Sequence, residues 1–258
     1  MFNFSEIVSK TAIILQRFGD PDYLSKIKDW VNLAQQYAVN SYDYWAELQS
    51  EYTFSSTDGT EKYYLPSDFD KPFRLFDNTN YRKLTWTTRE EYYSGNISTI
   101  ASSQTGIPTY AMLYGVNGVA RTISAATTVK VKSSSTNDNT GIIVRVEGWL
   151  DSAKTILGFD SITVSTSDPT SYTSGTVSFY GIVSNTKSDD TDGYITIADS
   201  SSNVLATIAA YDRSSRYPVL YLGLIPEDTF SYTTLYKRRA NRMVNDYVEI
   251  NDAFVINF

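Results

Sequence analysis

Tyr64-Leu65-Pro66-Ser67-Asp68-Phe69 separates two parts of this chain that differ in hydrophobic pattern. Before this stretch, apolar residues recur at three- and four-residue spacing, which is typical of helices. After it, short alternating runs are separated by turn residues, which is typical of strands. The sequence therefore predicts an α+β fold, with Pro66 ending a strand and turning the chain into a loop.

Two amphipathic helices are expected before this stretch. Ser5 is placed to cap the first, over residues 5–18, and Asp22 to cap the second, which should run to about residue 50. One apolar stripe follows the second helix, made of Ile27, Trp30, Val31, Ala34, Ala38, Tyr42, Trp45 and Leu48. Because the connection is short, the two helices should form an antiparallel pair.

Short local signals predict further elements between the helices and residue 115. Asp58-Gly59 lies between two alternating runs and predicts a β-hairpin. Thr88 and Glu91 have the spacing of a capping box and predict the start of a short helix. The Ser/Gly/Thr-rich residues 94–106 read as a loop, and residues 110–114 as a strand.

A Ser/Thr-rich segment over residues 116–217 predicts an inserted domain. Its short alternating runs are 128–132, 142–147, 161–164, 176–179, 194–197 and 204–209. Six or seven such strands favour an all-β, immunoglobulin-like sandwich. The expected division is thus a core over 1–115, the insertion over 116–217, and a return to the core over 218–258, with extended segments at 218–223, 229–236 and 247–257.

Composition excludes several kinds of chemistry. The 258 residues include no histidine and no cysteine, so disulfides, thiolate nucleophiles, Cys/His zinc sites and a histidine base are excluded. The net charge of −7 disfavours nonspecific nucleic-acid binding by the whole surface, although it suits a channel through which DNA slides. No apolar run approaches the ~20 residues of a membrane span, and no signal-peptide pattern opens the sequence.

Acidic clusters are the remaining candidates for a metal site or for catalysis. Residues 188–193 resemble part of a calcium loop, but a solvated turn before a strand explains them with fewer demands. Glu90-Glu91 and Asp68 with Asp70 are carboxylate pairs, as a glycosidase would need, yet nothing sets a cleft around them. We expect no catalytic set, no metal and no cofactor.

Five segments outside the insertion resemble, in order and approximate spacing, the adaptor (head-completion, portal-to-tail connector) proteins of tailed bacteriophages. They are residues 27–32 of the second helix, Tyr64 to Phe69, the Gly106-to-Tyr110 turn, Leu222 to Asp228, and Leu235 to Arg239. The sequence departs from this pattern in two ways. The β insertion is not part of the minimal adaptor, and no pattern of the further C-terminal helix that many such proteins carry is found after residue 239.

The resemblance implies a structural virion protein and not an enzyme. Such a protein would form a ring below the portal, a dodecamer as the family implies, where it joins the capsid to the tail and extends the DNA channel. Its partners would be the portal protein, tail or neck proteins and, in passing, genomic DNA, with no membrane. It would be assembled in the host cytoplasm and would reside in the virion as part of the head-tail connector.

Two sets of residues are candidates for this role. Ring or core architecture is expected of Trp30, Trp45, Tyr64, Pro66, Asp68 and Phe69, and Trp30, Trp45 and Trp86 are expected in the core. Docking to a partner is expected of the basic cluster Lys237, Arg238, Arg239 and Arg242, although a paired or solvated strand end explains it equally. A two-faced second helix would bury one side internally and the other against the next protomer.

Two other classes of function stay open at this point. The β insertion could be a carbohydrate- or surface-binding module of a phage neck or tail, with tyrosines that stack on sugars. The carboxylate pairs could belong to an enzyme that acts on glycans.

Overall fold

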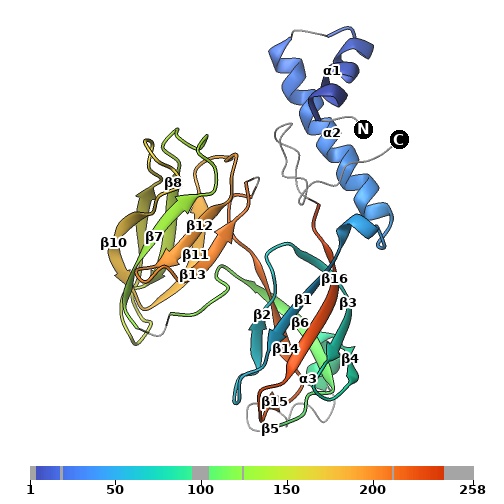
Figure 1. Ribbon diagram of the computed structural model, residues 1–258, viewed down its shortest axis with the longest axis vertical. Coiled ribbons are helices and arrows are strands. Elements are labelled where there is room, and N and C mark those ends of the chain that lie inside the picture. The colour runs from blue at the N-terminus through green and yellow to red at the C-terminus, as the bar shows by residue number, and fades with distance from the viewer. Residues whose placement is uncertain (1–3, 18–19, 95–104, 124, 211, 241–258) are drawn as a thin grey trace. The chain divides into compact units, whose positions relative to one another are not determined.

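The computed structural model describes residues 4–17, 20–94, 105–123, 125–210 and 212–240 (Figure 1). Their contacts define two compact units, one of the described residues up to Ser50 and from Lys237 on, and the other Glu51–Tyr236. Within these residues there are three α-helices, two of them an N-terminal pair, and many strands gathered in sheets. The predicted α+β fold with a β-rich part is therefore confirmed.

The N-terminal pair consists of α1 (Phe4–Ile14) and α2 (Pro21–Ser41). Val8 and Ala12 of α1 are buried together with Ile27 of α2, which gives the pair its own small core. The N-cap of α2 is Asp20 and not the expected Asp22, since Asp20 Oδ1 accepts a 3.3 Å hydrogen bond from the backbone nitrogen of Tyr23. Pro21 then takes the first helical position, where its missing N–H costs nothing.

Helix α2 ends at Ser41, so the expectation that it continues to about residue 50 is wrong. Tyr42 is extended, with φ −147° and ψ 132°, and only a short 3₁₀ turn, η1 (Ala46–Leu48), follows. The indole nitrogen of Trp45 donates to the carbonyl oxygen of Ala38 at 3.2 Å. A side chain thus satisfies a carbonyl that another helical turn would have used.

A seven-stranded sheet is the largest sheet in the described residues, with the order β1-β16-β3-β4-β6-β14-β2. Its strands are β1 (Gln49–Ser55), β16 (Ser231–Arg238), β3 (Phe69–Asp77), β4 (Arg82–Trp86), β6 (Tyr110–Asn117), β14 (Tyr217–Leu222) and β2 (Lys62–Tyr64). Its core includes Leu75, Leu84, Leu220 and Tyr232. Beside it, β5 (Thr105–Gly106) and β15 (Ile225–Pro226) pair in parallel.

The hairpin predicted around Asp58-Gly59 is wrong, because β1 and β2 lie at opposite edges of the seven-stranded sheet. Strand β1 pairs with β16, and β2 pairs with β14, both far away in the sequence. A turn does form, with Gly59 at a positive φ of 74° and its nitrogen bonded to the carbonyl oxygen of Pro226 at 3.1 Å. Long-range strand pairing overrides the local hairpin signal here.

The capping box at Thr88 is confirmed, and it opens helix α3 (Arg89–Ser94). The backbone nitrogen of Thr88 donates to Glu91 Oε2 at 3.0 Å, and the nitrogen of Glu91 donates to Thr88 Oγ1 at 3.2 Å. Most of the predicted loop at 94–106 and the whole expected segment at 247–257 lie outside the described residues.

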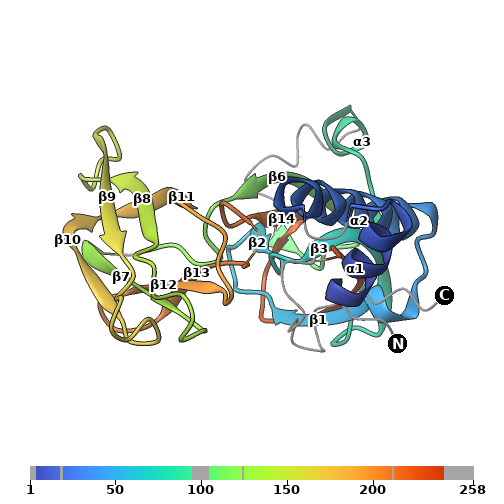
Figure 2. The same ribbon diagram turned by 90° about the horizontal axis from the view of Figure 1, so that it is seen from above.

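The β-rich part between β6 and β14 contains two further sheets. One has the order β10-β7-β12-β13 and the other β11-β8-β9, and Figure 2 shows them as two layers. Their strands are β7 (Thr127–Ser133), β8 (Ile143–Trp149), β9 (Leu157–Thr163), β10 (Thr173–Phe179), β11 (Gly181–Lys187), β12 (Ile195–Asp199) and β13 (Val204–Ile208). Residues of both sheets, such as Val131 and Val146, share one buried core. The immunoglobulin-like arrangement itself stays a prediction.

Strand β11 was not among the expected strands. It carries the polar residue Asn185 at a buried position, which breaks the apolar alternation that marks a strand. The amide of Asn185 donates to the carbonyl oxygen of Gly118 at 2.6 Å, and its Oδ1 accepts a 2.8 Å bond from Ser215 Oγ. This polar contact joins the two ends of the β-rich segment, near the point where Asn117 pairs with Tyr217.

Candidate subunit-docking surface

Helix α2 has one buried face and a second, apolar face that stays largely exposed in the described chain. Its buried positions include Ile27, Gln35 and Val39, which recur at helical spacing. Trp30, Leu33 and Tyr37 recur at i, i+3 and i+7 on another face, and Trp30 is 49% exposed and Tyr37 72% exposed. We call these three residues the α2 apolar face. A contiguous apolar stripe on a long helix is typical of an interaction surface.

Further exposed apolar side chains lie in the same unit. Of the twenty large hydrophobic side chains that are exposed in the described residues, eight fall between Ile13 and Tyr44. Several aromatic rings are already packed edge to face, including Tyr23 with Trp30 at 6.2 Å and Tyr42 with Trp45 at 5.7 Å between centroids. Such rings lose little further freedom when they dock against a partner.

The predicted architectural tryptophans lie in different environments. Trp30 belongs to the α2 apolar face, so the expectation that it is a core residue is wrong for this chain. Trp45 is half-buried and packs against the pair Val39 and Leu48. Trp86 is half-buried at the end of β4 and packs against the core of the seven-stranded sheet.

The Tyr64-to-Phe69 stretch is tied into the core of the larger unit. The backbone nitrogen of Phe69 donates to the carbonyl oxygen of Pro66 at 3.1 Å, which closes the turn. Phe69 stacks on Tyr236 with 4.7 Å between ring centroids, and the Tyr236 hydroxyl donates to Asp68 Oδ1 at 3.0 Å. Tyr64 is half-buried in β2. The stretch thus links β2 and β3 to β16, and its part in a ring stays a prediction.

Lys237 is buried and bonded within the chain, and the docking role expected of it stays a prediction. Its side chain is only 2% exposed, and its ammonium donates to the carbonyl oxygens of Val39 at 2.9 Å and Tyr42 at 3.3 Å. It also forms a 3.5 Å ion pair with Asp43. Since the last carbonyls of a helix lack partners within it, a cation placed there stabilises the end of α2.

The other members of the basic cluster are only partly described. Arg238 Nη2 donates to the carbonyl oxygen of Glu47 at 3.0 Å, and Arg239 is half-buried. Arg242 lies outside the described residues. The structure therefore brings Lys237 and Arg238 to the chain segment that follows α2, and not to a single free basic patch.

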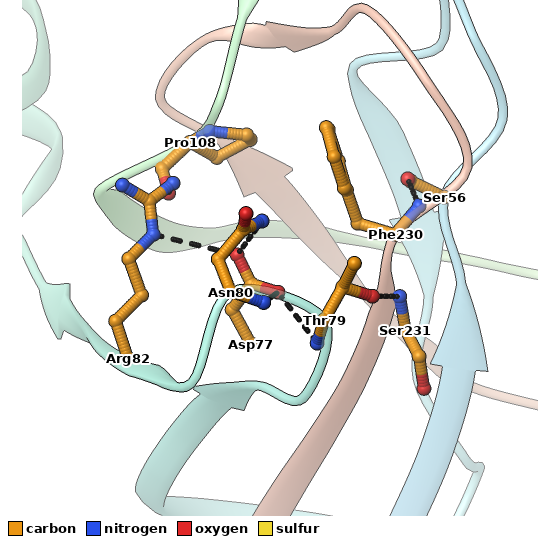
Figure 3. Close-up of polar contacts among 8 residues, drawn as sticks. All are labelled: Ser56, Asp77, Thr79, Asn80, Arg82, Pro108, Phe230 and Ser231. Carbon is orange, nitrogen blue, oxygen red and sulfur yellow. Dashed lines mark hydrogen bonds and ion pairs between the residues drawn. The ribbon is translucent and has the colours of Figure 1, made fainter.

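A network around Asp77 was not predicted from the sequence (Figure 3). Asp77 is fully buried and accepts hydrogen bonds from the backbone nitrogens of Thr79 at 3.1 Å and Asn80 at 3.0 Å. It also accepts from the Asn80 side chain at 2.8 Å and forms a 3.4 Å ion pair with Arg82. Arg82 in turn donates to the carbonyl oxygen of Pro108 at 2.6 Å. An Asp before a four-residue turn was the available signal.

Basic side chains of the protein contact the acidic loop at 188–193. Arg213 forms ion pairs with Asp189 at 3.5 Å and with Asp190 at 3.6 Å. The ammonium of Lys187 is buried, and it donates to Thr191 Oγ1 and to the carbonyl oxygen of Ala210, both at 2.6 Å. Within the described ranges, no group of three or more acidic side chains is placed to hold a metal ion. The loop is thus ordered by basic side chains.

The carboxylate pairs have structural partners of their own. Glu91 caps α3, and Asp68 accepts a hydrogen bond from Tyr236, so one carboxylate of each pair has a structural partner. Among the helices that the structure describes, none is long and apolar enough to cross a membrane.

Comparison with known proteins points to one family. The family model described as "SU10 adaptor protein" matches residues 2–140, which is more than half of the chain. The match covers the helical pair and the strands up to β7, and it ends before β8 of the β-rich part. A comparison with curated proteins gives no match.

Proposed function

The chain belongs to the SU10 adaptor protein family, and from this premise we propose that it forms a ring below the phage portal. A structural adaptor role in a bacteriophage follows from the family. The ring would join the capsid to the tail and extend the DNA channel, as a dodecamer by analogy with the family. The observation that carries the proposal is the α2 apolar face, which remains exposed in the single chain.

A closed ring gives this face a partner. In a cyclic assembly each copy presents one surface to the copy before it and a different surface to the copy after it. Trp30, Leu33 and Tyr37 would be buried in such a contact, while Ile27 stays in the core of the helical pair and Val39 stays packed with Leu48. Each contact can be modest, because many of them act together around a ring.

The remaining assignments follow the same proposal. The partners would be the portal protein, tail or neck proteins and, in passing, genomic DNA, in a virion assembled in the host cytoplasm. We also propose that the chain is divided into a core over 1–115, an insertion over 116–217 and a return to the core over 218–258. Within the last part, the segment after Lys237 would reach a neighbouring ring. Tyr64, Pro66, Asp68 and Phe69 would hold the core from which the ring is built. No catalytic activity is part of the proposal.

Electron microscopy of the protein mixed with its own portal ring tests the proposal. The expected result is a second ring stacked on the portal with matching symmetry. A Tyr37→Glu variant should remain folded but fail to form that ring, because the charge would be buried in the contact. The matched control is Tyr194→Glu, at an exposed tyrosine in the β-rich part. A wild-type chain that stays monomeric in the presence of the portal would contradict the ring.

A second candidate function rests on the outer face of β8 and β9. Phe159 is exposed there with the guanidinium of Arg145 at 4.1 Å from its ring centroid, and Leu157 is exposed beside it. An exposed aromatic ring with a polar neighbour can stack on a sugar, as a carbohydrate- or surface-binding module of the neck or tail would require. Phage particles that still adsorb normally after removal of the β-rich segment would exclude this function.

A further inference from the structure

The turn between β3 and β4 carries the most exposed aromatic side chain of the described residues. Tyr81 is 86% exposed, and its φ is +53°. Most residues with a β-carbon avoid this left-handed region, whereas glycine adopts it readily and asparagine adopts it more often than tyrosine does. Within the part of the chain that the structure describes, the Tyr81 ring makes no aromatic, cationic or hydrogen-bonding contact. No such contact of the Tyr81 ring within the described residues therefore offsets its unfavourable backbone conformation.

The turn that carries Tyr81 is held on both sides. The buried Asp77 fixes the backbone nitrogens of the turn, as Figure 3 shows. The backbone nitrogen of Asn78 donates to the carbonyl oxygen of Ser231 at 2.8 Å, and the nitrogen of Ser231 donates to Thr79 Oγ1 at 2.9 Å. An aromatic side chain on a fixed turn loses little conformational entropy on docking. Tyrosines of this kind are frequent anchors of protein interfaces.

The surroundings of Tyr81 favour a partner surface that carries aromatic rings. Phe76 and Lys83 are directly paired across β3 and β4, and both are exposed on the hairpin. Arg74 is exposed one pleat away on β3. Because cationic side chains are attracted to the faces of aromatic rings, Arg74 and Lys83 suit a surface such as the α2 apolar face, where Trp30 and Tyr37 are exposed.

We propose that Tyr81 is a docking anchor that packs against the α2 apolar face of a neighbouring copy. This inference rests on the proposed ring. A heterologous ring contact needs two different surfaces on each chain, both exposed before assembly. The α2 apolar face supplies one of them, and the β3–β4 turn with Tyr81 supplies an aromatic counterpart.

A Tyr81→Asn substitution separates a docking role from a structural one. Asparagine adopts a positive φ more readily than tyrosine, so the variant should melt at the same temperature as the wild type or at a higher one. It should nevertheless lose ring formation on the portal by at least tenfold, measured by native mass spectrometry. Tyr194→Asn is the matched control and should assemble normally. Unchanged assembly of Tyr81→Asn would overturn the proposal.

Cysteine cross-linking locates the contact, because the natural chain contains no cysteine. Ala34 is exposed one helical turn after Trp30, so Ala34→Cys is a small change at the border of the α2 apolar face. A chain with Tyr81→Cys and Ala34→Cys should give a ladder of disulfide-linked oligomers under oxidising conditions when assembled on the portal. Chains with either cysteine alone, or with Ala34→Cys and Tyr194→Cys, should not.

The two proposals fail in different ways. A wild-type chain that forms no ring would contradict the proposed function, and the anchor with it. Rings that assemble normally but give no ladder from the doubly substituted chain would contradict the anchor alone.

Discussion

Lys237 shows how a single distant side chain can determine where a helix ends. It lies almost two hundred residues after α2, yet its ammonium satisfies the carbonyl oxygens of Val39 and Tyr42. With Trp45 Nε1 on the carbonyl of Ala38, it provides donors that the helix cannot supply for its own last turn. The end of α2 is thus set by tertiary contacts.

Replacing this lysine should therefore cost much of the stability of the helical unit. Lys237→Met preserves the volume but leaves buried carbonyl groups without donors, so we expect the free energy of unfolding to fall by about 2–3 kcal/mol. Urea unfolding measures this change. Lys28→Met, at an exposed position of the same helix, should change it by less than about 0.5 kcal/mol. Equal effects of the two variants would contradict the capping role.

Lys187 should make stability depend on pH in an unusual direction. Burial is the main cause that lowers its pKa from 10.5 to about 8, and the carboxylate of Asp190 partly opposes this effect. Between these two values the unfolded chain binds the proton and the folded chain does not. The contribution of Lys187 to stability is therefore unfavourable below pH 8 and is relieved as the pH rises toward 10.5.

Urea unfolding at several pH values between 8 and 10.5 tests this linkage. The free energy of unfolding of the wild type should rise with pH relative to that of a Lys187→Gln variant, which has no proton to lose. Parallel pH profiles of the two proteins would show that the pKa of Lys187 is the same in the folded and unfolded states.

Residue roles could be predicted only where sequence neighbours determine them. Thr88 and Glu91 were paired correctly because the capping box is a contact over three residues. Trp30 was assigned to the core because it continues the periodicity of Ile27 and Val31, and periodicity does not tell which of two apolar faces turns inward. The burial of Lys237 depends on a contact with residues of another element, which no local pattern contains.

At the scale of elements, the start of α2 gives a direct comparison of two neighbouring carboxylates. Asp20 caps the helix, and Asp22 is a helical residue of its first turn. Asp20→Ala should lower the free energy of unfolding by about 1 kcal/mol, since the cap is lost. Asp22→Ala should lower it by only about 0.3–0.5 kcal/mol, through the helix dipole. Chemical unfolding followed by circular dichroism measures both changes. A larger loss of stability in Asp22→Ala than in Asp20→Ala would identify Asp22 as the N-cap instead.

Strands were predicted well where alternation is clean and poorly where a buried polar group interrupts it. Strands β7 and β8 alternate regularly and lie where the sequence indicated. Strand β11 was missed because Asn185 occupies an inward position and bonds to Gly118 and Ser215. The false hairpin had the correct strands and the correct turn but the wrong pairing, since β16 is the partner of β1.

At the scale of the whole molecule, the β-rich segment leaves and re-enters the seven-stranded sheet at adjacent positions. Asn117 of β6 and Tyr217 of β14 are paired residues, as they would be beside a hairpin turn. Removing the segment between them therefore leaves two chain ends that a short turn can join. This geometry is why long insertions are tolerated at such sites.

A chain in which residues 118–216 are replaced by Asn-Gly should consequently fold. Asn-Gly forms the type I′ turn that closes a two-residue hairpin. Tyr217 should be changed to Thr in this chain, because its hydroxyl accepts from the backbone nitrogen of Thr207 in the removed segment. We expect cooperative thermal unfolding and slow amide exchange in β6 and β14. Gradual melting with fast exchange in both strands would show that the sheet depends on the segment.

The family and the fold class could be predicted from the sequence, because both depend on the order of local patterns along the chain. The pairing of strands could not, since β1 with β16 and β2 with β14 join residues that are far apart in the sequence. The docking surfaces could be predicted in part. A two-faced α2 was expected, whereas Tyr81 became visible only with its backbone angle and its exposure.

The dependence of α2 on Lys237 affects when the helix can be completed during synthesis of the chain. A ribosome adds about 5–20 residues per second, so roughly 10–40 s pass between the synthesis of α2 and that of the lysine that completes it. During this interval the helix that carries Trp30 and Tyr37 lacks the two hydrogen bonds that Lys237 donates to the carbonyl oxygens at its end. If the α2 apolar face forms the proposed ring contact, we expect copies made side by side on one polysome to associate only after Lys237 has been added.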